Sequence, residues 1–258
     1  MPTPPTASSI MPGAEPWSHH GAGPHGALCL HGFTGNPSSM RGVAEAFAAA
    51  GFHVELPLLP GHGTAVEDML GTRWADWAAE AMAAYERLSA RADAVVVAGL
   101  SMGGTLALHV ACEHPEVAAV VCINPAAQPQ PPEVMEMVHA MVAEGHELLP
   151  GTGPDIADPE GSDLAYDGTP LRSLISMIED GVGPLAARLP AGEVPLLLIT
   201  SRRDHVVDPL QSDYLAEHWG GAVERMTLER SYHVATQDFD RELVNEAAVA
   251  FARRVTAR

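Results

Sequence analysis

The hydrophobic positions of the chain fall into short continuous runs, separated by stretches with helical spacing. The runs are rich in Val, Leu and Ile, which is typical of strands buried on both faces of a parallel sheet. They cover residues 27–30, 53–56, 94–98, 117–123, 194–201 and 223–228. Apolar residues recur with helical spacing in residues 38–50, 74–91, 105–113, 210–219 and 242–254. This alternation predicts an α/β fold with a mostly parallel central sheet and helices on both faces.

The run at residues 94–98 leads into a short glycine-rich segment. Gly99-Leu100-Ser101-Met102-Gly103 fits the pattern G-x-S-x-G, a turn that takes a strand into a helix and leaves its serine strained and exposed. Such a pattern can arise by chance in a chain with 24 glycines. The predicted strand before it and the predicted helix after it favour the functional interpretation, in which Ser101 is a nucleophile.

A second turn lies at the end of the first run, in residues 31–35 (H-G-F-T-G). In folds that carry the serine turn, an N–H group of this early loop serves as a hydrogen-bond donor to the reaction centre. We therefore expect the backbone N–H groups of Phe33 and Met102 to form an oxyanion hole beside Ser101. Each donor of this kind stabilises a transition state by roughly 3–4 kcal/mol.

The other two groups of a catalytic triad are sought at the ends of later strands. Asp204 follows the run at residues 194–201, and His233 follows the run at residues 223–228. The order Ser101, Asp204, His233 is that of the α/β-hydrolase fold. Asp208 is the rival acid, although its place before Pro209 is typical of a helix N-cap. His205 is the rival base, but it is adjacent to the predicted acid.

The alternation of strands and helices stops between residues 125 and 190. We interpret these residues as a lid inserted above Ser101, with residues 1–124 and 191–258 as the core and residues 1–24 as a loose N-terminal arm with a short edge strand near Trp17. A methionine-rich helix is predicted at residues 133–144, and a second one is expected to begin with Thr169 as N-cap and Pro170 in the first turn.

The apolar positions of the first lid helix form one stripe. The stripe contains Val134, Met137, Val138, Met141 and Val142, with Met135 beside it. Methionine adapts to irregular apolar partners, so we expect Met135 and Met141 to line a tunnel for a flexible acyl chain. The alternative is that the stripe serves packing alone.

Composition narrows the choice of partner. The 14 basic residues, all arginine, stand against 33 acidic ones, for a formal net charge of −19. Such a surface repels nucleic acid and anionic membranes, so we expect a neutral small-molecule substrate and no nucleic-acid partner. The histidines near the N-terminus (His19, His20, His25) lack further ligands at fixed spacing, and we expect no metal there.

The cysteines and the apolar run lengths bear on the compartment. Cys29, Cys112 and Cys122 lie in predicted strands and a helix, and an odd count in such elements favours free thiols in a reducing compartment. The first residues lack the pattern of a signal peptide, and no apolar run has the length that spans a bilayer. We expect a cytoplasmic protein without a stable membrane anchor.

Several segments of the chain resemble those of a known family. The segments H-G-F-T-G-N-P-S-S-M-R, L-P-G-H-G-T, G-L-S-M-G-G-T-L, D-H-V-V, S-Y-H-V-A-T and L-A-Y-D-G-T-P are similar to those of bacterial monoacylglycerol lipases and related carboxylesterases. The resemblance implies hydrolysis of a monoacylglycerol to glycerol and a fatty acid through an acyl-enzyme, without metal or organic cofactor. It assigns the triad to Ser101, Asp204 and His233, and the oxyanion hole to Phe33 and Met102.

Asp163 precedes the segment L-A-Y-D-G-T-P in the predicted lid. A glycerol site needs hydrogen-bond acceptors in an otherwise apolar channel, so we hypothesise that Asp163 binds the glycerol hydroxyls. A solvated lid carboxylate is an equally good interpretation.

Two other functions stay open at this point. A broad carboxylesterase acting on short acyl esters would use the same triad. A binding protein for a hydrophobic ligand would carry a vestigial one, and labelling of Ser101 by a fluorophosphonate separates it from an enzyme. Epoxide hydrolases and dehalogenases are disfavoured because their nucleophile is an aspartate.

Overall fold

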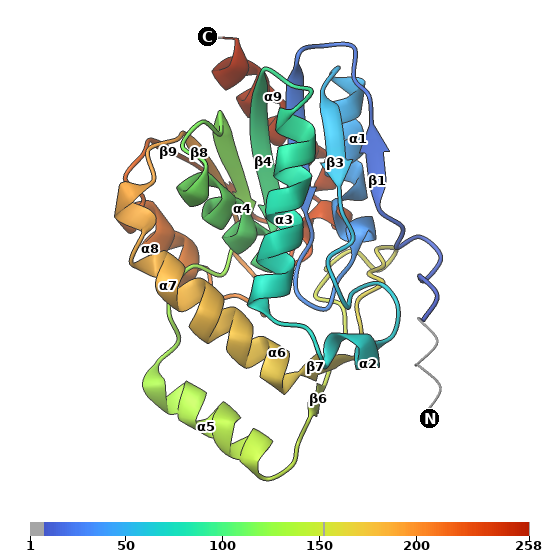
Figure 1. The fold of residues 1–258 in the computed structure, drawn as a ribbon, viewed down its shortest axis with the longest axis vertical. Helices are drawn as coiled ribbons and strands as arrows, with labels where there is room; N and C mark the ends of the chain where they lie inside the picture. The colour runs from blue at the N-terminus through green and yellow to red at the C-terminus, as the bar shows by residue number, and fades with distance from the viewer. Residues whose placement is uncertain (1–7, 152, 258) are drawn as a thin grey trace.

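The computed structural model describes residues 8–151 and 153–257 and contains a central sheet of seven strands (Figure 1). The strands lie in the order β1-β3-β2-β4-β5-β8-β9. Every neighbouring pair is parallel except β1 and β3, which are antiparallel. The bounds are β1 Trp17–His19, β2 His25–Leu30, β3 His53–Leu56, β4 Ala94–Leu100, β5 Ala119–Ile123, β8 Leu196–Ser201 and β9 Val223–Leu228. The predicted parallel sheet and the edge strand near Trp17 are thereby confirmed.

Helices cover both faces of this sheet, as predicted. The helices α1 (Arg41–Ala49) and α9 (Arg241–Thr256) bury apolar residues in one core cluster. The helices α3 (Trp74–Ser89), α4 (Met102–Glu113) and α8 (Leu210–His218) bury theirs in the cluster on the other face. The shorter helical turns are η1 Pro37–Met40, α2 Val66–Met69, η3 Leu189–Ala191 and η4 Ala235–Gln237.

Residues 125–190, here called the insertion, lie between β5 and β8. They contain α5 (Pro132–Ala143), α6 (Leu171–Ser176), a π-helical turn η2 (Met177–Val182) and α7 (Gly183–Ala186). They also contain β6 (Leu148–Pro150) and β7 (Gly168–Pro170), which form a two-stranded antiparallel sheet. The prediction that Thr169 and Pro170 begin a helix is therefore wrong, because both residues pair with β6 and the helix begins at Leu171.

The first helix of the insertion, α5, packs against α6 and stands at the lower edge of the molecule in Figure 1. Met135 and Val138 are its buried residues, whereas Met137 is 59% exposed. The predicted stripe is thus wrong at Met137. The buried face of α5 contains Met135, which the prediction places beside the stripe, together with Val138. One helical face cannot hold residues 135, 137 and 138 together, since successive positions are about 100° apart.

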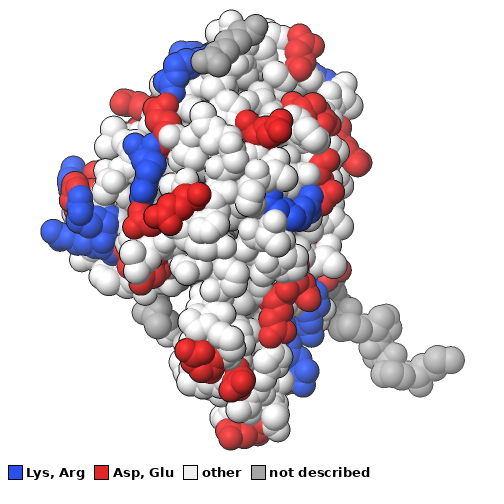
Figure 2. Space-filling view, turned by 90° about the vertical axis from the view of Figure 1, so that its left-hand side faces the viewer, with Lys and Arg blue, Asp and Glu red and all other residues white. Residues whose placement is uncertain are grey.

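The surface carries charges of both signs. On the face shown in Figure 2, acidic and basic side chains are interspersed among wide uncharged areas. This face therefore offers no continuous basic patch of the kind that binds a phosphate backbone. Among the described residues, no helix combines the length and the hydropathy that crossing a bilayer requires.

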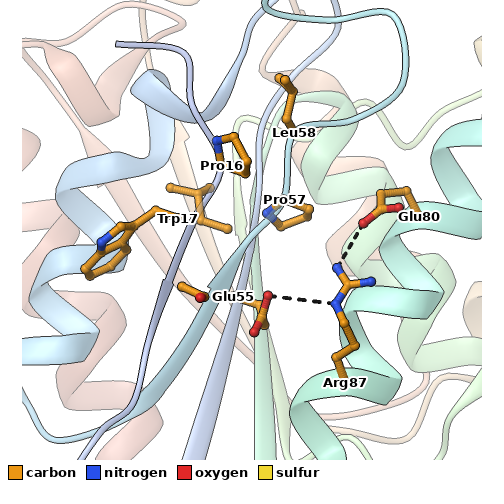
Figure 3. Close-up of a pocket in the computed structure, with 9 residues that line it drawn as sticks. Pro16, Trp17, Glu55, Pro57, Leu58, Glu80 and Arg87 are labelled. Carbon is orange, nitrogen blue, oxygen red and sulfur yellow. Dashed lines mark hydrogen bonds and ion pairs between the residues drawn. The ribbon is translucent and has the colours of Figure 1, made fainter. Parts of the chain in front are cut away.

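The described part of the chain has two surface cavities of similar volume. One of about 340 Å³ lies at the sheet edge between β1, β3 and α3 (Figure 3), where Arg87 contacts Glu80 at 2.9 Å and Glu55 at 4.0 Å. The other, of about 300 Å³, lies between the start of β2 and the end of α9. Neither is lined by Ser101, Asp204 or His233.

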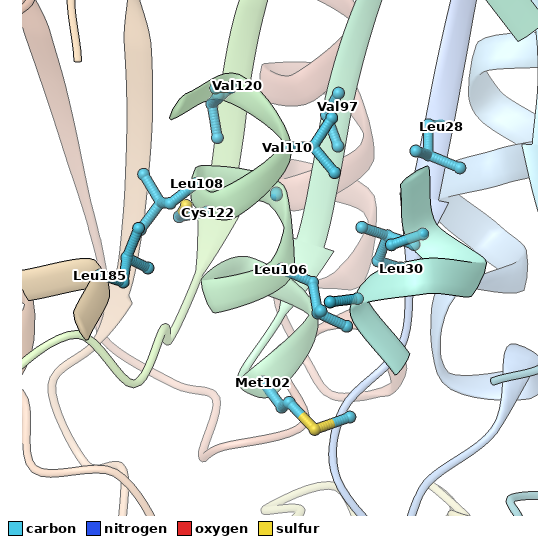
Figure 4. Close-up of a cluster of buried hydrophobic side chains, with 14 of the residues drawn as sticks. Leu28, Leu30, Val97, Met102, Leu106, Leu108, Val110, Val120, Cys122 and Leu185 are labelled. Carbon is cyan, nitrogen blue, oxygen red and sulfur yellow. The ribbon is translucent and has the colours of Figure 1, made fainter. Parts of the chain in front are cut away.

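The core between the sheet and α4 sets the position of the serine turn. Leu30 of β2, Val97 of β4 and Leu106 of α4 belong to one buried cluster (Figure 4). The helix α4 approaches β2 so closely that a Cβ atom on Gly103 would lie 2.0 Å from the carbonyl oxygen of Leu30. Only glycine allows this backbone contact.

Gly103→Ala is expected to lower the free energy of unfolding by about 3 kcal/mol or more, because backbone atoms of β2 must move. For a chain of this size, that loss lowers the melting temperature by roughly 6 °C or more. Gly71→Ala is the control, since nothing lies within 4 Å of a Cβ there. Equal melting temperatures of the two variants, measured by calorimetry, would contradict the close approach.

Candidate active site

Ser101 occupies the sharp turn between β4 and α4. Its backbone dihedrals are φ 55° and ψ −122°, a strained conformation for a residue with a side chain. The turn requires glycine at position 99, because a Cβ there would lie 2.0 Å from the carbonyl oxygen of Gly103, and at position 103, because a Cβ there would lie 2.0 Å from the carbonyl oxygen of Leu30. The N–H of Ser101 donates to Ile123 O at 2.9 Å, and this bond ties the turn to the end of β5. The strained turn therefore places Ser101 just beyond the carboxyl end of β4.

The two N–H groups predicted for the oxyanion hole belong to segments that flank this turn. A Cβ on Gly32 would lie 3.2 Å from Ser101 Cβ, so the loop that carries Phe33 lies against the serine. Met102 is the first residue of α4, and the first N–H groups of a helix have no partner within it. The site therefore presents a helix N-terminus, which favours developing negative charge.

Asp204 and His233 meet beyond the end of β8. Asp204 Oδ2 lies 2.7 Å from His233 Nδ1, and the two side chains are 1% and 9% exposed. The other oxygen of Asp204 accepts from the N–H groups of Val206 (2.9 Å) and Val207 (2.8 Å). The carboxylate is therefore fixed, and a neutral His233 that donates through Nδ1 has a free Nε2 to accept a proton.

The two rival residues have other partners. Asp208 Oδ1 accepts from the N–H of Leu210 at 2.9 Å, in the first turn of α8. His205 Nδ1 lies 2.7 Å from Asp155 Oδ1, and its side chain is mostly exposed. Neither geometry brings the rival to Ser101.

Ser101 follows β4 and His233 follows β9, and β5 and β8 separate these two strands in the sheet. Asn124 follows β5, the strand adjacent to β4. Asn124 Nδ2 donates to the carbonyl oxygen of His233 at 2.8 Å, so the histidine loop lies over the end of β5. The hydrogen bonds of the described residues do not include one between Ser101 Oγ and the imidazole. Catalytic hydrogen bonds are often long before substrate binds.

Three polar residues near the triad were missed from sequence. Asn124 is buried with φ 46°, and its side chain donates a hydrogen bond to the carbonyl oxygen of His233. Asp155 of the insertion accepts from the N–H of His233 at 3.0 Å. Asp238, fully buried, accepts from the N–H of Tyr232 at 2.8 Å. The position of Asn124 at the carboxyl end of a central strand was the one available signal.

Residues 164–166 of the insertion, which precede β7, contact the loop that carries Phe33. The N–H of Tyr166 donates to Thr34 O at 3.0 Å, and Asn36 Nδ2 donates to Leu164 O at 3.0 Å. The hydroxyl of Tyr166 donates to Gly61 O at 2.9 Å. These contacts fix residues 164–166 beside the loop that carries Phe33.

Asp163 adjoins this segment and is largely buried. Its Oδ1 is shielded from solvent and has no hydrogen-bond partner among the described residues. Burial raises the pKa of the Asp163 carboxyl, while a backbone hydrogen bond from Ala165 and the electrostatic effect of the nearby His233 oppose the rise. The structure therefore brings Asp163 into the neighbourhood of His233. Met135 and Met141 lie on α5, and neither belongs to the two core clusters of the described residues.

Two buried histidines lie behind the oxyanion side. The rings of His31 and His62 are 5.0 Å apart, and His62 also contacts Phe33 and Trp77 edge to face. The N–H of Leu59 donates to His31 Nε2 at 3.1 Å. Burial lowers the pKa of His62 to about 4 and also lowers that of His31. Both imidazoles are thus neutral at pH 7.

The described residues contain no group of three or more His, Cys, Asp or Glu side chains placed to hold a metal ion. The groups at Ser101, Asp204 and His233 are instead those of nucleophilic catalysis.

Fold and site together define the class of protein as an α/β-hydrolase. The family model described as "Serine aminopeptidase, S33" matches residues 24–240, and the chain belongs to this family. It is 39% identical to a thermostable monoacylglycerol lipase of a Bacillus species, over 94% of this chain and 95% of the relative. It is 24% identical to a carboxylesterase of Bacillus subtilis, over 93% of this chain and 97% of that one.

Solved structures agree with this assignment. A metagenome-derived lipolytic enzyme superimposes with a TM-score of 0.89 at 40% identity, covering 95% of this chain and all of the other. A monoacylglycerol lipase of Paleococcus ferrophilus superimposes with a TM-score of 0.72 at 17% identity, covering 93% and 99% of the two chains. The second likeness shows the fold alone.

The depressed histidine pKa values predict a loss of stability in acid. Between pH 6.5 and about 4 the unfolded chain binds a proton that folded His62 does not, so the free energy of unfolding falls as pH falls. His62 alone accounts for up to about 3 kcal/mol, at 1.36 kcal/mol for each pH unit.

His62→Asn should lose less stability than the parent between pH 6.5 and 4.5 in urea titrations. His146→Asn, at an exposed position, serves as the control and should keep the parental pH dependence. The same acid loss in both variants would show that His62 is not held neutral.

Proposed function

We propose that this chain hydrolyses monoacylglycerols to glycerol and a free fatty acid through an acyl-enzyme on Ser101. The observation that carries the proposal is the buried pair of Asp204 and His233, in a chain whose Ser101 is held at φ 55° in the turn after β4. A carboxylate that fixes an imidazole, next to a strained and accessible serine, is the arrangement that makes a hydroxyl nucleophilic.

The steps follow from proton chemistry. Ser101 Oγ attacks the ester carbonyl while His233 Nε2 accepts its proton, and Asp204 stabilises the imidazolium. The N–H groups of Phe33 and Met102 stabilise the negative oxygen of the tetrahedral intermediate. His233 then donates the proton to the departing glycerol oxygen, leaving the acyl group on Ser101. Water attacks this ester by the same route, releasing the fatty acid and restoring the serine.

Two observations support glycerol as the leaving group, one on Asp163 and one on a similar protein from a Bacillus species. The lone Oδ1 of Asp163 near His233 is an acceptor of the kind that a glycerol hydroxyl would satisfy. The Bacillus relative is named a monoacylglycerol lipase. In this proposal residues 125–190 act as a lid, and Met135 and Met141 contact the acyl chain. The net charge of −19 suits a neutral ester.

A broad carboxylesterase on short acyl esters is the second candidate. The carboxylesterase of Bacillus subtilis favours it, because its similarity spans nearly the whole chain. The name of the family model raises peptide hydrolysis as a further comparison. Both alternatives use the same triad, so the substrate has to be measured.

We further propose a cytoplasmic location and a neutral lipid ester as the small-molecule partner. The three cysteines are free, and Cys29 and Cys122 are buried. Burial raises the pKa of the Cys29 thiol to about 12, so it stays protonated. Free thiols of this kind persist in a reducing compartment.

A substrate panel tests the proposal. We expect turnover of long-chain monoacylglycerol to exceed that of di- and triacylglycerols and of an aminoacyl anilide. A kcat/KM for a short nitrophenyl ester far above that for long-chain monoacylglycerol would instead identify the broad carboxylesterase.

The triad assignment predicts severe losses in single variants. Ser101→Ala, Asp204→Asn and His233→Ala should each lower kcat by about 10⁴-fold or more while the circular dichroism spectrum is unchanged. His205→Asn, at the rival base, should keep at least half of the parental kcat. A reversal between the His233 and His205 variants would overturn the assignment.

Asp163→Ala should lower kcat/KM for monoacylglycerol by about 10-fold or more, since a hydrogen bond to a charged group is lost. Turnover of the matching methyl ester, which has no glycerol, should stay unchanged. Asp167→Ala, at an exposed carboxylate of the same segment, is the matched control. An unchanged ratio of the two substrates in the Asp163 variant would show that this carboxylate does not bind glycerol.

A further inference from the structure

Asp155 of the insertion contacts the backbone of both triad loops. Its side chain is 14% exposed. Its Oδ2 accepts from the N–H of His233 and from the N–H of His205, both at 3.0 Å. Its Oδ1 lies 2.7 Å from His205 Nδ1, and its own carbonyl oxygen accepts from the N–H of Val234 at 3.1 Å. One carboxylate therefore joins the histidine loop to the residue that follows Asp204.

His233 is held on both sides of its backbone. Asp155 binds its N–H, and Asn124 Nδ2 binds its carbonyl oxygen at 2.8 Å. The residue lies in a loop between β9 and η4, so no helix or strand fixes its direction. Asp204 binds the imidazole, and these two side chains fix the backbone that carries it, so together they hold the ring in one position.

The segment around Asp155 is itself fastened to the core. The carboxylate of Asp238 accepts from the N–H of Ala157 at 2.8 Å and from the N–H of Asp158 at 2.9 Å. It also accepts from the N–H of Tyr232 at 2.8 Å, next to His233. The insertion and the histidine loop are thus bound together by one carboxylate from each side.

We propose that Asp155 is a positioning residue, through which the insertion sets the geometry between His233 and Asp204. This inference rests on the proposed function, because it concerns the proton transfer at Ser101. It makes the insertion part of the chemical step, in addition to any role in substrate binding. A purely structural Asp155 would instead affect stability, or KM, without a specific effect on kcat.

The test compares four variants in the full chain. Asp155→Ala removes both backbone contacts, and Asp155→Asn keeps an oxygen that can accept from both N–H groups. His205→Gln removes the imidazole contact and leaves those to the backbone. Asp158→Ala is the matched control, because its carboxylate also accepts two hydrogen bonds, from Glu160 N and Arg241, without contacting a triad loop.

The measured quantities are kcat and KM for long-chain monoacylglycerol, the rate of Ser101 labelling by an uncharged fluorophosphonate, and the melting temperature. Asp155→Ala should lower kcat and the labelling rate by about 100-fold, with KM within about threefold of the parent, as a displaced catalytic group does. Asp155→Asn should stay within about fivefold of the parent. The His205 and Asp158 variants should be close to the parent in both rates.

Equal losses of kcat in the Asp155→Ala and Asp158→Ala variants would overturn the proposal, as would a loss confined to KM. Should Asp155→Ala not fold, Asp155→Glu replaces it, because it keeps the charge but moves the carboxylate. Positioning then predicts a lower kcat for Asp155→Glu than for Asp155→Asn, and the reverse order contradicts it. If the parent chain neither labels nor hydrolyses esters, the proposed function fails. A parent that does both, beside an Asp155→Ala variant equal to it, contradicts the positioning role alone.

Discussion

The strained backbone of Ser101 is the constraint on which the rest of the structure depends. A residue with a side chain at φ 55° costs on the order of 1–3 kcal/mol, so its surroundings must impose it. The imposing contacts are backbone to backbone: Gly103 lies against Leu30, and Gly99 lies against Gly103. The buried strands β2, β4 and β5 supply the stability that offsets the strain. The buried sheet and the strained turn at Ser101 are therefore parts of one arrangement.

The insertion adds a second constraint, which acts on the loops around the serine. Residues 155–158 bind the histidine loop, while residues 164–166 bind the loop that carries Phe33. Both segments follow α5, which packs on α6. In the proposed lid, the motion that admits a lipid is assigned to α5, because the inner segments are bound to the loops around Ser101. On this view the insertion combines a fixed inner segment with an outer helix that carries Met135 and Met141.

Much of the fold could be predicted because its signals are local. Each parallel strand is a run rich in Val, Leu and Ile, and apolar residues recur with helical spacing in each long helix. Both signals depend only on residues that are close together in the sequence. Ser101 could be found for the same reason, since the turn needs glycine on both sides. That Asp204 and His233 would lie close together followed from the rule that functional groups of an α/β sheet lie after strand ends.

The errors share the opposite cause. Thr169 and Pro170 form a strand only because β6 pairs with them from about twenty residues away, which helix-start signals in the local sequence cannot reveal. Met137 is apolar and fits the helical spacing of the predicted stripe, yet it is exposed, because α6 packs against the face of α5 that carries Met135. Asn124, Asp155 and Asp238 are polar residues outside the strands and helices, and their partners are distant in sequence. Such contacts have no periodic signature, so they became visible only in three dimensions.

The central claim is that one serine, activated by His233, reacts covalently. The most direct measurement is mass spectrometry of the chain after treatment with an uncharged fluorophosphonate, followed by peptide mapping, for the parent, Ser101→Ala and His233→Ala. We expect one adduct on the peptide that contains Ser101, no adduct in the first variant and strongly slowed labelling in the second. An unlabelled parent, an adduct on another residue, or a labelling rate unaffected by the loss of His233 would contradict it.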